Sequence, residues 1–128
     1  MRKKEIYVAL DGVEFDDSSK CEEYERRMAA VQYGNTLFVY DEDGERIDNL
    51  NDYKLYNYST YIQCYDKKAF NYINDIMDGY NRPLTDTVEV KSFPITIFYN
   101  EFTEEYEDLN EYVEKLQKEL DKCKKYLV

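Results

Sequence analysis

The sequence predicts an α+β fold, with about three helices packed on a small, mostly antiparallel sheet of about five to six short strands. Two observations lead to this prediction. Short stretches that alternate, or that are rich in β-branched and aromatic residues, recur along the chain with turn signals between them. Three longer stretches place apolar residues at three- and four-residue steps, as amphipathic helices do. With 128 residues, of which 43% are hydrophobic, the chain is expected to form a single α+β domain over residues 1–128.

The N-terminal part predicts a hairpin followed by a helix. Residues 5–10 alternate as a strand does, Asp11-Gly12 is a tight-turn signal, and residues 13–15 form the expected return strand. Gly34 is expected to end the helix that follows. The apolar face expected for this helix consists of Cys21, Tyr24, Met28 and Val31.

The middle of the chain predicts further strands around a second helix. Asp66 is expected to cap this helix, and Gly79 to follow its last turn. Residues 53–57 carry no pattern that favours one structure. The strands are expected at residues 36–40, 59–65, 86–91 and 95–99. The apolar face of the helix is expected to be Ala69, Phe70, Ile73, Ile76 and Met77.

The longest periodic pattern lies at the C-terminal end and predicts a helix over residues 103–127. Its apolar residues follow alternating four- and three-residue steps: Phe102, Tyr106, Leu109, Val113, Leu116, Leu120, Cys123 and Leu127. Because the other elements need a surface to pack on, this long helix is expected to be the spine of the core. The alternative is a coiled-coil seam whose distal end joins two copies of the chain as a homodimer.

The balance of charge points to a basic partner. The formal net charge is −11 at pH 7, which repels nucleic acid, so no direct nucleic-acid binding is expected. If the charge serves binding, the expected partner is a basic protein, such as one that itself binds DNA or RNA. The alternative explanation is that the charge serves solubility alone.

Two acidic groups are candidate partner-binding residues. On the expected C-terminal helix, one row of carboxylates has three- and four-residue steps, about 5–6 Å apart, which approximates the spacing of phosphates along a nucleic-acid strand. The row consists of Glu104, Glu107, Asp108, Glu111 and Glu114. The second group is the turn Asp41, Glu42 and Asp43. The alternative for the row is a helix start that favours acids anyway, together with a solvated face.

Tyrosine is unusually frequent, with 15 residues in the chain. Tyrosine offers a large flat contact area with a polar tip and is enriched at protein interfaces. Acid–tyrosine neighbours recur, as in Glu23-Tyr24-Glu25 and Asp52-Tyr53. The tyrosines without a clear place on an apolar face are candidate contacts for arginine and lysine of a partner: Tyr53, Tyr56, Tyr58 and Tyr112.

The sequence argues against an enzyme and against a metal or cofactor site. It has no histidine, no nucleophile elbow and no glycine-rich phosphate loop. The acidic turn fails as a calcium loop, because with Gly44 in the sixth position the first and twelfth ligands would be Val39 and Leu50. Three widely spaced cysteines favour a reducing cytoplasm. The basic residues 1–4 are followed by no apolar run, so neither a signal peptide nor a membrane span is expected.

The opening of the chain resembles the strand, DG turn, strand and helix found at the start of small phage- and prophage-encoded proteins. The matching residues are Tyr7-Val8-Ala9, Asp11-Gly12, Glu14-Phe15, Cys21 and Tyr24-Glu25. In size, acidity and tyrosine content the chain is also similar to anti-CRISPR proteins, several of which block Cas nucleases by DNA mimicry. This resemblance implies a phage-encoded inhibitor that acts in the bacterial cytoplasm.

The sequence therefore leads to two hypotheses about function. The first is a non-enzymatic acidic protein that inhibits a basic, nucleic-acid-binding host defence protein, with a Cas nuclease as the suspected partner. The second is a structural or assembly module that homodimerises through its C-terminal helix or an edge strand.

Overall fold

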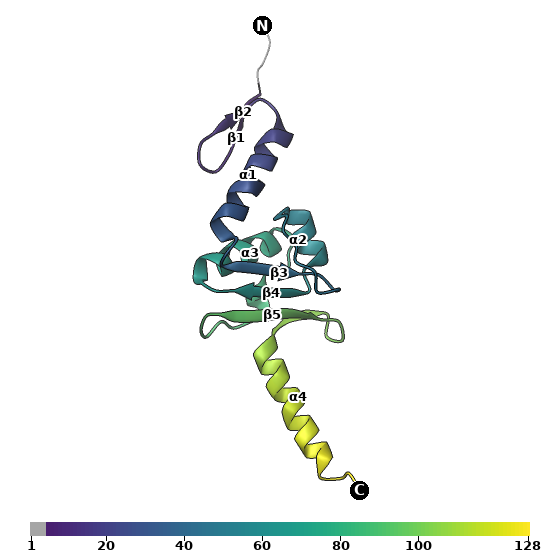
Figure 1. The fold of residues 1–128 in the computed structure, drawn as a ribbon. Helices are drawn as coiled ribbons and strands as arrows, with labels where there is room; N and C mark the ends of the chain where they lie inside the picture. Colours follow the sequence, from purple (N-terminus) through teal and green to yellow (C-terminus); the bar gives the residue numbers. More distant parts are fainter. Residues whose placement is uncertain (1–4) are drawn as a thin grey trace.

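The computed structural model describes residues 5–128 and shows an elongated molecule (Figure 1). The N-terminal hairpin and helix α1 (Ser18–Tyr33) extend from one side of a central body that holds the larger sheet. Helix α4 (Leu109–Lys124) extends from the opposite side, so the N-terminal hairpin and the far end of α4 lie at opposite ends of the molecule. The basic segment at residues 1–4 lies outside the described residues.

The N-terminal hairpin forms as the turn signal predicts. Strands β1 (Tyr7–Val8) and β2 (Glu14–Phe15) pair antiparallel. Gly12 lies between them with φ of 92°, a conformation that a side chain disfavours and that glycine adopts freely. Helix α1 follows, and the Asp17 carboxylate accepts the backbone N–H of Ser19 at 2.8 Å as its N-terminal cap.

The expected apolar face of α1 is buried only in part. Cys21 is buried, but Met28 and Val31 are exposed, so the prediction is wrong at those two positions. The physical reason is that α1 projects away from the body (Figure 1). The helix joins the main core through Ala29, near its C-terminal end.

The central body is built on an antiparallel sheet with the strand order β3-β4-β5-β6. Its strands are β3 (Leu37–Tyr40), β4 (Tyr61–Cys64), β5 (Ile95–Asn100) and β6 (Glu105–Asp108). Val39 lies opposite Ile62, and Ile62 lies opposite Ile97. Directly opposed residues share a face of a sheet, so these three side chains form one apolar row across three strands.

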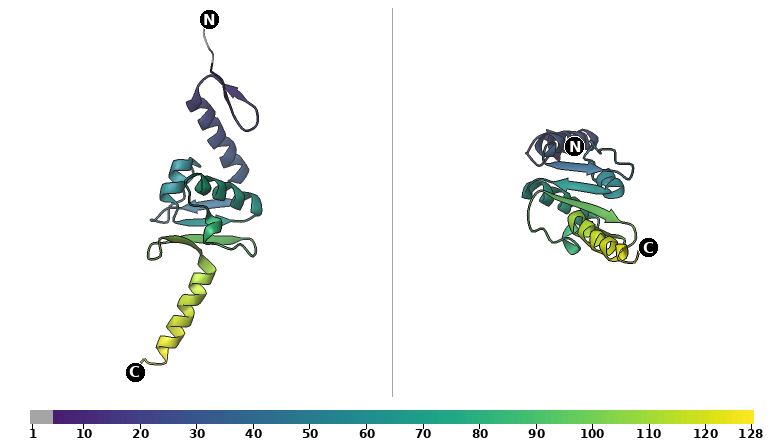
Figure 2. Two further views of the ribbon diagram at one scale, coloured as in Figure 1. Left: turned by 180° about the vertical axis from the view of Figure 1, so that it is seen from behind. Right: turned by 60° about the horizontal axis from the view of Figure 1, so that its bottom comes forward.

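Helices cover the face of the sheet from which this row projects. They are helix α2 (Asp52–Tyr58), helix α3 (Lys67–Gly79) and the short 3-10 helix η1 (Leu84–Asp86) (Figure 2). On the opposite face, Arg46 lies over the ring of Phe38 at 4.5 Å, and Tyr112 packs on Phe98 with ring centroids 4.7 Å apart. The body therefore has two layers, with the core between the sheet and α3.

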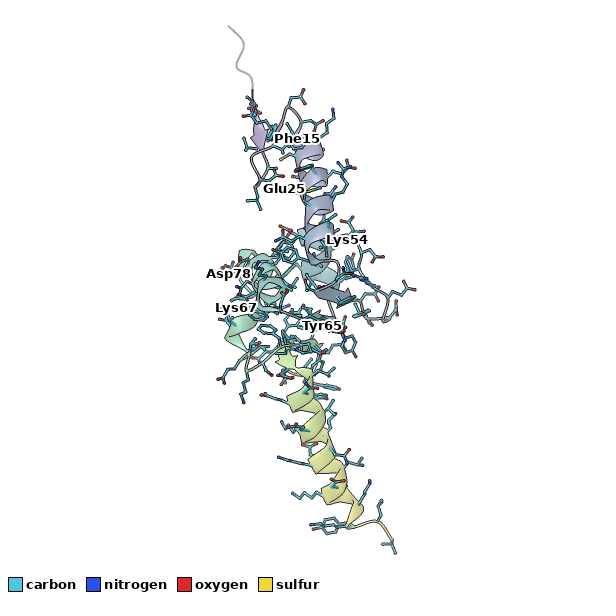
Figure 3. The ribbon with its side chains drawn as sticks, turned by 60° about the vertical axis from the view of Figure 1, so that its left-hand side comes forward. Phe15, Glu25, Lys54, Tyr65, Lys67 and Asp78 are labelled. Atoms are coloured by element: carbon cyan, nitrogen blue, oxygen red, sulfur yellow. The ribbon has the colours of Figure 1, made fainter. Side chains whose placement is uncertain are left out.

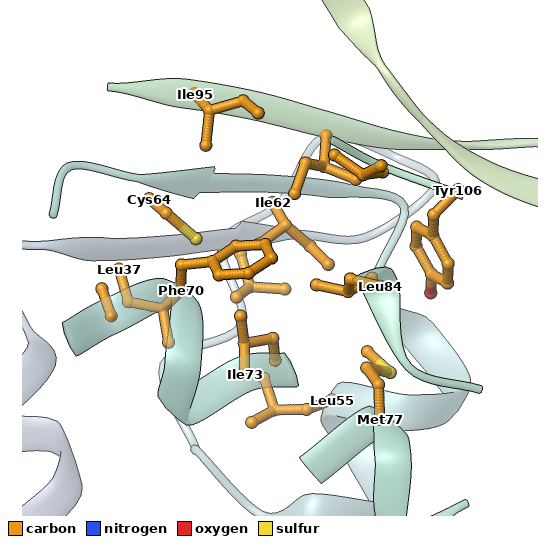
Figure 4. Packing of buried hydrophobic residues seen from close by; sticks show 14 of the residues in the cluster. Leu37, Leu55, Ile62, Cys64, Phe70, Ile73, Met77, Leu84, Ile95 and Tyr106 are labelled. Carbon is orange, nitrogen blue, oxygen red and sulfur yellow. The ribbon is translucent and has the colours of Figure 1, made fainter. Parts of the chain in front are cut away.

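The core is centred on α3 (Figure 4). Ile73 and Met77 of α3 are fully buried and belong to the same cluster as Ile62 of the sheet. Leu55 of α2 and Leu84 of η1, both fully buried, belong to this cluster too. The expected face of this helix is confirmed, since Ala69, Phe70, Ile73 and Met77 are buried and Ile76 packs against the cluster.

The expected start of the C-terminal helix is wrong. Residues 105–108 form strand β6, which pairs with β5, and α4 begins at Leu109. Asp108 caps it, because its carboxylate accepts the backbone N–H of Asn110 at 2.9 Å. Tyr106, expected on the helical stripe, is buried in the sheet, where its hydroxyl donates to the Ser59 carbonyl at 3.0 Å.

The expected role of the C-terminal helix as the spine of the core is also wrong. Helix α4 has no buried residue, and Leu116 and Leu120 are 45% and 51% exposed. The core is already filled by α3, whose short, strongly amphipathic sequence covers the sheet. The apolar stripe of α4 therefore has no counterpart within the described chain.

Two further segments differ from expectation. Residues 53–57, which showed no pattern, lie in α2, where the Asn51 side chain accepts the backbone N–H of Tyr53 at 2.9 Å. Residues 86–91 were expected to be a strand, but the segment continues from η1 without regular strand pairing. The α+β class is confirmed, with four α-helices and six strands among residues 5–128.

A pair of alanine variants tests which helix belongs to the core. Ile62→Ala removes a side chain with 0% exposure, so it should lower the free energy of unfolding by about 2–5 kcal/mol. Leu116→Ala should lower it by less than about 1 kcal/mol, because the side chain is largely in water. Urea unfolding at one low protein concentration measures both, and equal losses would contradict the exposed position of α4.

Buried tyrosines predict a change of stability at alkaline pH. Burial raises the pKa of Tyr72 and of Tyr106 to about 12, against about 10 in an unfolded chain. The folded state holds these protons more tightly, so their contribution to stability is complete below about pH 10 and is lost as the pH rises toward 12.

A pH titration that follows the ultraviolet absorbance of tyrosinate should show the ionisation of the buried tyrosines as a late step, after the exposed tyrosines have ionised. Tyr106→Phe should reduce the amplitude of the late step, since burial raises the pKa of this hydroxyl to about 12. A single transition near the ordinary tyrosine pKa would show that neither side chain is buried.

Candidate functional site

A groove of about 810 Å³ separates the N-terminal unit, which consists of the β1–β2 hairpin and α1, from the central body. The tip of the β1–β2 hairpin and α1 form one side, and the start of α2 together with α3 forms the other. Figure 3 shows the hairpin and α1, marked by Phe15 and Glu25, on one side of this region and α3, marked by Asp78, on the other. The groove exists because α1 touches the body at its C-terminal end and projects beyond it.

The side of the groove formed by the hairpin and α1 is held by hydrogen bonds. The Tyr24 hydroxyl donates to the Asp11 carboxylate at the hairpin tip, and this bond lowers the pKa of Asp11. The backbone N–H of Leu10 donates to the Glu25 carboxylate at 3.0 Å. Phe15 also packs on Tyr24, with ring centroids 5.2 Å apart. Two side chains of α1 therefore fix the hairpin over the groove.

The groove is strongly acidic. Among residues 5–128, its lining includes one basic residue, Arg26, against five carboxylates from the hairpin, α1, α2 and α3. The five acids are Asp11, Glu22, Glu25, Asp52 and Asp75. Burial raises the pKa of Asp52, and the charges of Glu25 and Glu22 raise it further. Carboxylates from the two sides of the groove thus repel one another, and a cation between them would relieve that repulsion.

Tyrosines supply the flat surfaces of the groove. They are Tyr24, Tyr33, Tyr53, Tyr72 and Tyr80. Tyr33 of α1 stacks on Tyr72 of α3 with ring centroids 4.3 Å apart, which ties the two sides together at the base. Tyr80 stacks on Tyr56 at 4.2 Å, while Tyr53 is 60% exposed. Tyrosine faces beside carboxylates form an environment that attracts guanidinium and ammonium groups.

The predicted site residues do not come together in this groove. Tyr53 is the one member of the predicted set that lines it. Tyr56 reaches it indirectly, through its stack on Tyr80. Tyr58, at the end of α2, is exposed but does not line the groove. The predicted acids lie elsewhere, on the turn after β3 and around the junction of β6 and α4.

The predicted helical row of carboxylates does not form, because the helix starts too late in the sequence. Glu104 lies in the turn before β6 and Glu107 lies in β6 itself. Asp108 is occupied as the cap of α4, and Glu111 pairs with Lys91 at 3.6 Å. Of the five, Glu111 and Glu114 alone lie in α4. A role for these residues in partner binding stays a prediction, but the phosphate-like helical spacing is wrong.

The remaining predicted residues have structural contacts. The Asp41 carboxylate accepts the backbone N–H groups of Asp43 and Glu45, both at 2.9 Å, and so shapes the turn after β3. Glu42 is exposed at the tip of the same turn. Tyr112 lies on Phe98, on the sheet face opposite the main core.

Part of the groove has a signal in the sequence. The acid–tyrosine neighbours Glu23-Tyr24-Glu25 and Asp52-Tyr53 contribute residues to its two sides. What the pattern could not indicate is that α1 and α2 face each other across a gap. That arrangement depends on tertiary contacts such as the Tyr33–Tyr72 stack.

Comparisons with protein-family models, with curated proteins and with solved structures found no match to this chain. Within residues 5–128, no group of three or more acidic, cysteine or histidine side chains is arranged to hold a metal ion. No helix of that same range is long and apolar enough to cross a membrane. The groove is therefore interpreted from its own residues.

Proposed function

We propose that this chain is a non-enzymatic, acidic binding protein whose groove receives a basic segment of a partner protein. The observation that supports this most is the combination, in one groove, of five carboxylates and five tyrosines with one basic residue among the described part of the chain, residues 5–128. The carboxylates attract a cationic segment, and the tyrosine rings add cation–π contacts. The concave shape removes part of the bound segment from water, which strengthens both interactions.

The class of partner follows from charge. Segments rich in arginine and lysine are typical of proteins that bind nucleic acid. A chain with a net charge of −11 is repelled by nucleic acid and is attracted by such a segment. The proposed activity is therefore inhibition of a nucleic-acid-binding protein, in which carboxylates occupy the place of phosphates.

The resemblance in character to anti-CRISPR proteins extends this proposal to a host. On that basis the chain is a phage-encoded inhibitor of a host defence protein in the bacterial cytoplasm, and a Cas nuclease is the first partner to test. The carboxylates that act in this proposal are those of the groove, since the residues from Glu104 to Glu114 do not form a helical row.

Charge reversal in the groove tests the proposal with a matched control. Glu22→Lys with Asp75→Lys adds four charge units in the groove, at two exposed positions on α1 and α3. Glu45→Lys with Glu101→Lys adds the same charge at two exposed positions outside it. Binding of a fluorescent arginine-rich peptide, measured by anisotropy at low and high salt, compares both with the unchanged chain.

The groove variant should bind the peptide at least about tenfold more weakly, which corresponds to about 1.4 kcal/mol. The control variant should change affinity by less than about threefold, because its charges act from a distance and are screened by salt. Circular dichroism checks that both variants keep their fold. Equal losses in the two variants would mean that net charge, and not the groove, determines binding.

A second measurement addresses the partner itself. Purified Cas nucleases, immobilised one at a time, should retain the chain, and added DNA should displace it if the two compete for one basic surface. Retention that DNA does not reduce would contradict competition for the nucleic-acid surface. If no nuclease in the panel retains the chain while peptide binding is intact, the Cas proposal is rejected and the groove remains a site for another basic protein.

A further inference from the structure

We propose that two copies of this chain pair through α4 in antiparallel orientation, each helix covering the apolar stripe of the other. This interface lies at the opposite end of the molecule from the groove (Figure 1). The proposal goes beyond the binding function proposed above and does not rest on it, so either can fail without the other.

The α4 stripe consists of Val113, Leu116, Leu120 and Cys123, and all four side chains are exposed. Alternating steps of three and four residues keep them on one side of the helix, as in a coiled-coil seam. Leu109 precedes the stripe and Leu127 follows it at the same spacing. A soluble helix usually packs such a stripe on something, and within residues 5–128 the core is already closed by α3.

The spacing of the stripe matches itself when the helix is reversed. With the centre of the stripe as a two-fold axis, Leu116 lies opposite Leu120 of the second copy, and Val113 lies opposite Cys123 of the second copy. Each copy makes the same contacts to the other, so two copies satisfy the interface and the assembly closes as a dimer.

The charges of α4 favour the antiparallel orientation. The first charges of α4 are acidic and the last are basic, with mixed charges between them: Asp108, Glu111 and Glu114 come first, then Lys115, Lys118, Glu119 and Asp121, then Lys122, Lys124 and Lys125. Antiparallel pairing places the acidic start of each helix beside the lysine-rich end of the other, and it also opposes the two helix dipoles. Parallel pairing would place acids beside acids, and it would bring the two bodies together at the same end of the helices.

One residue distinguishes the two orientations. In the antiparallel register Glu119 lies beside Glu119 of the second copy, a like-charge contact that weakens the dimer. In a parallel coiled coil Glu119 would lie beside Lys124 of the second copy, a favourable contact. Replacing Glu119 by a neutral residue therefore has opposite effects in the two arrangements.

Sedimentation velocity of the full chain over a range of concentrations tests the pairing. The chain should pass from monomer to dimer only in the upper micromolar range, because the 16 residues of α4 supply a seam of only about two heptads. Leu116→Lys with Leu120→Lys should remain monomeric at every concentration with an unchanged circular dichroism spectrum, since both side chains are exposed in the monomer. A wild-type chain that stays monomeric throughout would overturn the proposal.

Cross-linking and charge removal test the orientation. Val113→Cys, oxidised in the presence of the native Cys123, should form covalent dimers through these two positions, and Val113→Cys with Cys123→Ser should not. Glu119→Gln should tighten the dimer severalfold. Ready cross-linking of the wild-type chain through Cys123 alone, or a weaker dimer for Glu119→Gln, would overturn the antiparallel arrangement in favour of a parallel one.

Discussion

The packing of α3 on one face of the sheet is the interaction on which the rest of the molecule depends. Ile73 and Met77 of α3 meet the apolar row that crosses β3, β4 and β5, and this contact fills the space between helix and sheet. Once it is filled, no room is left in the core for a second long helix. The N-terminal unit and α4 are therefore held outside the body, and both surfaces with a proposed role arise from this exclusion.

Local chemistry in the sequence predicted the elements whose structure is decided locally. The Asp11-Gly12 turn, the Asp66 cap and the periodic face of α3 each depend on neighbouring residues, and each prediction is confirmed. The C-terminal stripe shows the limit of such reasoning. A heptad pattern indicates that one side of a helix is apolar, but it does not indicate what covers that side. Tyr106 fits the same spacing and yet belongs to a strand, because pairing with β5 and its bond to Ser59 favour the sheet.

The candidate site was less predictable than the fold for a related reason. Tyr53 was selected because it has no clear place on an apolar face, and it does line the groove. Glu22 and Asp75 carry no local signal that distinguishes them from other surface acids. They belong to the candidate site because they line the gap between α1 and α3. This gap is set by the part of α1 on the N-terminal side of Ala29, which projects from the body, and by the stack of Tyr33 on Tyr72.

Binding of a basic segment in the groove can be measured directly by nuclear magnetic resonance titration of the isotope-labelled chain with an arginine-rich peptide. Backbone amide shifts map contact residue by residue without any change of sequence. A peptide bound in the groove should give saturable shifts at the hairpin tip around Leu10, along the groove side of α1 near Glu25, and at Tyr53 at the start of α2. Shifts concentrated instead at the junction of β6 and α4, or small shifts spread evenly over all acidic surfaces, would show that the groove is not the binding site.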